Sequence, residues 1–140
     1  MNTIAKNKII MKSIIRLIVI VLAMFPAIGF AQTAKTTWPE LKAFHALMSK
    51  TFHPAEEGNY EPLKIKADSL LMAAKAWKES KIPDTYKPKE TAETLTKLLE
   101  QCIVLEGAVK AKADDMKLKV LITDAHELFH KIVGECKKED

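Results

Sequence analysis

The sequence predicts an all-α protein, an up-down-up-down antiparallel four-helix bundle preceded by a cleavable signal peptide. Apolar residues recur every three or four positions in four successive segments, which is the spacing of one buried helix face. Only 4 of the 140 residues are glycine, and no segment alternates polar with β-branched residues, so strands and tight hairpins are not predicted. The connections between the four segments are short, which favours successive helices lying side by side and antiparallel.

The first 31 residues have the composition of a secretory signal peptide. Four basic residues accompany an almost uninterrupted apolar run over residues 14–25, which is short for a bilayer span. Gly29 and Ala31 supply the small residues expected three positions and one position before a cleavage site. Cleavage before Gln32 is predicted to leave one domain, residues 32–140, in the periplasm or outside the cell.

The charge of the expected mature domain argues against two classes of partner. The whole chain has 22 basic and 18 acidic residues, and the signal peptide holds four of the basic and none of the acidic ones. The domain therefore has 18 of each and a formal net charge of zero. Nucleic acid and anionic membrane surfaces select basic domains, so neither is predicted to bind. Nothing in the sequence identifies a protein partner.

The first predicted helix runs from Trp38 and Pro39 to Phe52 and His53. Proline suits an opening turn because it lacks the N–H that would be unpaired there, and Pro54 is expected to end the helix. The apolar positions step by three and four residues, and they are Leu41, Phe44, Met48 and Phe52.

Three further helices are predicted with the same pattern. The second opens at Pro62 and runs to about Ser80, and the third follows Pro88 and runs to about Lys112. The fourth is capped by Asp114 or Asp115 and extends to about residue 136. Each has one apolar stripe and a lysine-rich outer face, as expected for a helix packed on one side. Three methionines are expected to fill core gaps: Met48, Met72 and Met116.

The segment His126-Glu127-Leu128-Phe129-His130 matches the H-E-x-x-H pattern of zinc peptidases, in which two histidines hold the metal and the glutamate activates water. Such an enzyme needs a third ligand and a strand edge for its substrate. Ten residues follow His130, and no strand is predicted. At ~100° per residue, Glu127 lies nearly opposite the apolar stripe and is expected to face solvent. Catalysis is therefore not predicted, and a peptidase is the least favoured function.

The four histidines of the chain lie on the first and last predicted helices. His126 and His130 flank the apolar stripe of the last helix, and His45 and His53 flank that of the first. In an antiparallel bundle these helices are neighbours, so His45 is expected level with His130 and His53 level with His126.

Two facing histidine pairs predict a site for a divalent transition metal, with zinc or copper favoured and nickel also suitable. Glu56 and Glu57 are candidates for an additional ligand. One ion is not expected to reach all four histidines, so a site of two or three histidines, or two separate sites, is preferred. Solvated surface histidines are the structural alternative.

The exported bundle, with Met48 on its first helix and histidine on its last, resembles the cytochrome b562 and cytochrome c′ family. The resemblance covers residues 32–140 and implies a haem alternative in which Met48 and His126 or His130 ligate haem b for electron transfer. Covalent haem attachment needs C-x-x-C-H, which this sequence lacks. Its two cysteines, Cys102 and Cys136, are far apart and are expected to be free thiols or to form a bridge between two molecules, and not to pair with each other. The favoured function is metal binding or buffering by a protein that is not an enzyme.

Overall fold

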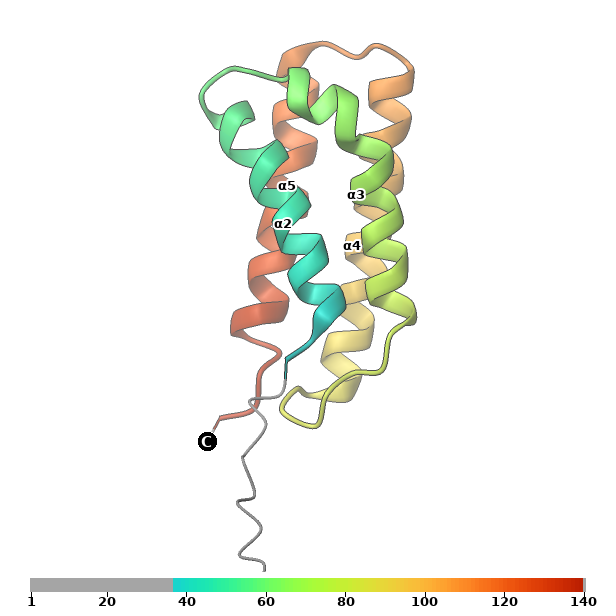
Figure 1. Cartoon of the computed structure of the whole chain (residues 1–140), viewed down its shortest axis with the longest axis vertical. Coiled ribbons are helices and arrows are strands. Elements are labelled where there is room, and N and C mark those ends of the chain that lie inside the picture. The colour runs from blue at the N-terminus through green and yellow to red at the C-terminus, as the bar shows by residue number, and fades with distance from the viewer. Residues whose placement is uncertain (1–36, 140) are drawn as a thin grey trace, which may run out of the picture. The chain divides into compact units, whose positions relative to one another are not determined.

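The computed structural model describes residues 37–139, which form four α-helices (Figure 1). Within this range there is no strand, only an isolated antiparallel β-bridge between Tyr86 and Lys137. The all-α prediction is therefore confirmed. The predicted signal peptide lies outside the described residues, and no helix within residues 37–139 is long and apolar enough to cross a membrane. The helices are α2 (Pro39–Glu56), α3 (Glu61–Glu79), α4 (Pro88–Lys110) and α5 (Asp115–Gly134).

Each helix runs antiparallel to the next, and the four close into a ring (Figure 1). Helix α2 packs against α3, α3 against α4, and α4 against α5, while α2 also contacts α5. Within the described range, the backbones of the diagonal pairs, α2 with α4 and α3 with α5, do not approach each other closely, and these pairs meet only through side chains. The backbones of α2 and α5 approach each other less closely than those of the other three neighbouring pairs. The interface between α2 and α5, here called the α2–α5 seam, is consequently the widest of the four interfaces between neighbouring helices.

Helix α2 continues past Pro54 to Glu56, so the prediction that Pro54 ends the helix was wrong. Pro54 lies in the last turn, where its missing N–H costs a single helical hydrogen bond and its fixed φ still suits a helix. The helix ends instead in a Schellman motif. Gly58 adopts φ 87°. Its N–H donates to Ala55 O (3.1 Å), and the Asn59 N–H donates to Pro54 O (2.8 Å).

Helix α4 ends at Lys110, two residues before the predicted end, in a second Schellman motif. Here Lys112 occupies the left-handed position with φ 54°. The N–H of Lys112 donates to Val109 O (3.0 Å), and that of Ala113 donates to Ala108 O (3.0 Å). Helix α5 begins directly afterwards, capped by Asp114, whose Oδ1 accepts from the Lys117 N–H at 2.8 Å.

The core contains the stripes predicted from the sequence, together with an aromatic cluster. Phe44 and Met48 are fully buried, whereas Met72 and Met116 are 58% and 76% exposed, so the core prediction was wrong for these two methionines. Both cysteines are buried free thiols, as expected. The fully buried large side chains are Trp77, Phe44, Met48, Leu63, Leu70, Leu95, Leu98, Leu105, Leu118, Ile122 and Ile132.

The aromatic cluster lies in the part of the core that is next to the α2–α5 seam. The Trp77 ring lies 5.3 Å from Phe44 and 6.0 Å from Phe129, measured between ring centroids. Trp38 meets Trp77 edge-on at 5.4 Å, and its indole N–H donates to Ser80 Oγ at 2.8 Å. Phe129 therefore reaches the seam from a rigid, close-packed base, which fixes the position of its neighbours on α5.

Candidate metal centre

His126 and His130 lie one turn apart on α5, and their imidazole rings meet. Residues four apart share a helix face, so their side chains are neighbours. The two Nε2 atoms are 3.2 Å apart, and the ring centroids are 4.5 Å apart. One ring donates an N–H to the other, and the tautomer decides which. His130 is exposed, while His126 is half-buried.

His53 reaches the same seam from the last turn of α2. Its ring centroid lies 6.4 Å from that of His126. Its Nδ1 is 3.1 Å from Oε2 of Glu56, one turn further along α2, and both side chains are more than half exposed. A carboxylate on one ring nitrogen favours the tautomer that leaves Nε2 unprotonated and able to bind a metal. The seam therefore brings together three histidines and one glutamate from two helices.

Two phenylalanines stack on histidines of the α2–α5 seam, one on His126 and one on His45. The Phe52 ring stacks on His126 with a centroid distance of 3.6 Å and an interplanar angle of 13°. Phe129 stacks on His45 at 5.1 Å, with the rings parallel to within 1°. Rings this large between two helices push the backbones apart, because interaxial distance follows the size of the contacting side chains. This accounts for the greater width of the α2–α5 seam.

His126 has a pKa below the ordinary histidine value. Partial burial, mainly beneath Phe52, is the largest cause, because burial disfavours the charged imidazolium. Repulsion from His130, His53 and His45 lowers the pKa further, while Glu56 opposes these effects. The neutral imidazole is the form that binds a metal, so the site favours the ligating state of His126 at neutral pH.

The spacing of His126 and His130 suits a single metal ion. Two nitrogen ligands about 2.05 Å from a tetrahedral zinc ion lie about 3.3 Å from each other. The observed 3.2 Å between the Nε2 atoms is close to that value. Within residues 37–139, no group of three or more histidine, cysteine, aspartate or glutamate side chains is arranged to hold one ion. A third ligand therefore requires His53 or Glu56 to change rotamer.

The remaining residues that the sequence suggested for a site do not join the group of three histidines and one glutamate. His45 is exposed and lies over Phe129, and it forms no hydrogen bond with another histidine in the described part of the chain. Glu57 is exposed at the end of α2, where its backbone N–H donates to His53 O. Glu127, the glutamate of the H-E-x-x-H pattern, is exposed. This exposure agrees with the prediction that Glu127 faces solvent.

Met48, the methionine of the haem alternative, is fully buried in the core. His126, its proposed partner, is covered by Phe52. A haem between the two side chains would require Phe52 to leave its position on His126 and the core around Met48 to open.

The two stacking phenylalanines are the site residues that the sequence reasoning missed. A signal for them is present, because three of the four histidines directly follow a phenylalanine, at Phe44-His45, Phe52-His53 and Phe129-His130. Such a dipeptide on the edge of an apolar stripe places a buried ring beside an exposed imidazole. Comparisons of the chain with protein-family models, curated proteins and solved structures find no match.

Proposed function

We propose that this protein binds a divalent transition metal through His126 and His130, with His53 and Glu56 completing the site from the facing helix. The 3.2 Å separation of the two Nε2 atoms on α5 is the observation that supports this most directly. Affinity for nitrogen ligands rises from nickel to copper and falls again at zinc, and all three metals accept imidazole. The expected cargo is zinc or copper.

The proposed role is binding or buffering, not catalysis. Two ligands from one helix and up to two from another leave the ion at an exposed seam, where it can be exchanged with solvent or with a donor. The exposure of Glu127 and the absence of a strand from residues 37–139 support binding in preference to peptide hydrolysis. Export through the N-terminal signal, with the domain in the periplasm or outside the cell, belongs to the same proposal.

Zinc and copper titration followed by native mass spectrometry tests this function. The purified protein should take up one ion, and the double variant His126→Ala with His130→Ala should take up none. His53→Ala should weaken binding while preserving the stoichiometry, and Glu127→Gln should bind as the wild type does. Unchanged uptake by the His126 and His130 double variant would place the metal elsewhere. A Soret band in the purified protein would favour the haem alternative instead.

A further inference from the structure

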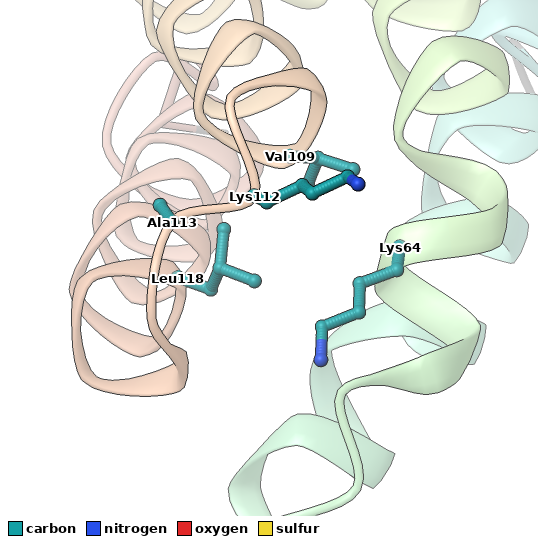
Figure 2. A pocket seen from close by; sticks show the side chains of 5 residues that line it. All are labelled: Lys64, Val109, Lys112, Ala113 and Leu118. Carbon is teal, nitrogen blue, oxygen red and sulfur yellow. The ribbon is translucent and has the colours of Figure 1, made fainter.

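A pocket of about 390 Å³ lies where the α4–α5 turn faces the start of α3, and it is separate from the histidines (Figure 2). Its volume falls within the range of about 300–1,000 Å³ that is usual for small-molecule sites. Five residues line it: Lys64, Val109, Lys112, Ala113 and Leu118. Three of the five are apolar and the other two are lysines, so a hydrocarbon surface and positive charge occur side by side.

The two lysines enter the pocket from opposite sides. In Figure 2 the Lys112 side chain extends from the α4–α5 turn towards α3, and the Lys64 side chain extends from α3 towards the turn. Leu118 points into the space between them from α5. Leu118 is only 1% exposed, so it forms a fixed apolar floor.

The charges of the two lysines are balanced to different degrees. Lys64 pairs with Asp115 at 3.1 Å and with Glu61 at 3.4 Å, and its hydrogen bond with Asp115 is the main reason its pKa is raised. Lys112 has no ion pair and no side-chain hydrogen bond with any residue in the range 37–139. Two carboxylates therefore stand against two lysines around the pocket, and Lys112 is the lysine that is left free to pair with an anionic group of a ligand.

The backbone of Lys112 is a second unusual feature of this pocket. A Schellman motif normally places glycine at the left-handed position, because a Cβ atom is disfavoured there. At the corresponding position of α2 this chain has glycine, Gly58. At the end of α4 it has lysine, whose side chain the motif directs over the pocket. A disfavoured backbone conformation thus coincides with the one unpaired cation of the site.

We infer that this pocket binds a small monocarboxylate with a short hydrocarbon tail, the carboxylate pairing with Lys112 and the tail lying on Val109, Ala113 and Leu118. Hydrogen bonds between an ammonium and a carboxylate are among the stronger ones, and the apolar floor adds burial of the tail. The inference is independent of the proposed metal site. The two sites use no residue in common.

Titration with octanoate below its micelle concentration, followed by calorimetry and by NMR shifts of α4 and α5 amides, tests this inference. Octanoate should bind saturably and more tightly than acetate, which lacks the tail, or octanol, which lacks the charge. Lys112→Gly should weaken binding by roughly tenfold or more, because a charged hydrogen bond is lost. The same change relieves the left-handed strain and should raise Tm, so lost binding is distinguishable from a damaged fold.

Two further variants complete the design. Ala113→Leu keeps both lysines but fills the pocket, and it should also reduce octanoate binding. Lys119→Ala removes an exposed lysine that does not line the pocket, and it should bind octanoate as the wild type does. Equal affinity of wild type and Lys112→Gly would overturn the inference. So would equal affinity for acetate and octanoate, or binding to anionic phospholipid vesicles without any binding of octanoate.

Discussion

At the scale of single residues, the environment of His126 combines two effects that favour its neutral form. Phe52 covers one face of the ring, and three other histidines contribute repulsion when they are charged. An imidazole in this setting serves a metal site well, because protons and metal compete for the same nitrogen. The same environment gives the folded protein a dependence on pH.

The stability of the metal-free protein should fall on acidification because of His126. Its pKa is lower in the folded than in the unfolded state, so the folded state binds fewer protons and stability rises with pH. This contribution is complete above about pH 6.5, the unfolded value, and is lost as the pH falls from there towards the folded pKa. Urea unfolding between pH 5 and 8 measures it. His126→Phe keeps a ring against Phe52 and should show a shallower dependence, whereas an unchanged pH profile would contradict the assignment to His126.

The sequence predicted that His53 and His126 face each other across the seam, but not how each ring is held. The predicted pairing of His45 with His130 stays a prediction, and the His45 ring lies over Phe129. Helical spacing alone places His53 and His126 at one level, and the structure brings their rings within 6.4 Å. Rotamers depend on what packs around them, and the stacking of Phe52 on His126 involves residues from two helices. Such a contact between segments far apart in the chain has no periodic signature in the sequence.

At the scale of elements, α2 and α4 end in the same backbone motif with different residues at the left-handed position. The motif in α2 has glycine and the motif in α4 has lysine. Space does not explain the difference, because a Cβ atom added at Gly58 would meet nothing within 4 Å. The preference for glycine at Gly58 is therefore a matter of backbone conformation alone.

Opposite substitutions at the two helix ends should change stability in opposite directions. Gly58→Ala should lower the free energy of unfolding by about 1 kcal/mol, because alanine is disfavoured at positive φ. Lys112→Gly should raise it by a similar or smaller amount, since glycine also gains entropy in the unfolded chain. Urea midpoints at constant m-value provide the measurement. A stabilising Gly58→Ala would show that φ 87° is not required at this turn.

The residues at which the helices end were the part of the secondary structure least predictable from the sequence. Pro54 was expected to stop α2, but its position in the last turn lets the helix run to Glu56. The third helix was expected to run to about Lys112, and the left-handed φ of 54° at this residue was not predicted because lysine carries no stop signal. Asp114, by contrast, was one of two predicted caps, and its side chain makes the expected bond to the Lys117 N–H.

At the scale of the whole molecule, the proposed metal site spans the widest seam of the ring. The other three helix pairs are joined by short connections, whereas α2 and α5 are joined only through side chains. The sequence predicted this ring because each of the four linked helices has one apolar face. All four faces are buried when the helices pack around a common core. It did not predict that aromatic rings would widen the closing seam, since seam width depends on contacts between the first and last helices.

A metal bound by both helices should stabilise the whole bundle. At a free metal concentration of 100 times Kd, the gain is about 2.7 kcal/mol, which raises Tm by roughly 10 °C or more for a domain of this size. Thermal unfolding with and without zinc measures the effect. The His126 and His130 double variant should lose the shift. A shift fully retained in a variant with both His53→Ala and Glu56→Ala would show that α5 alone holds the ion.

The β-bridge between Tyr86 and Lys137 lies at one end of the bundle, and the two ends are held together by different contacts. The Lys87 N–H donates to Cys136 O, and the Lys138 N–H donates to Thr85 O, which fastens the segment after α5 to the α3–α4 loop. Tyr86 also packs against Trp38 at the start of α2. Three parts of the chain are thus tied together at one end, while the opposite end has two compact turns and the ion pair between Lys64 and Asp115. His53 and Glu56 lie near that opposite end with more than half of each side chain exposed, so in the proposed metal site their side chains would turn towards the ion while the fastened end keeps the helices in register.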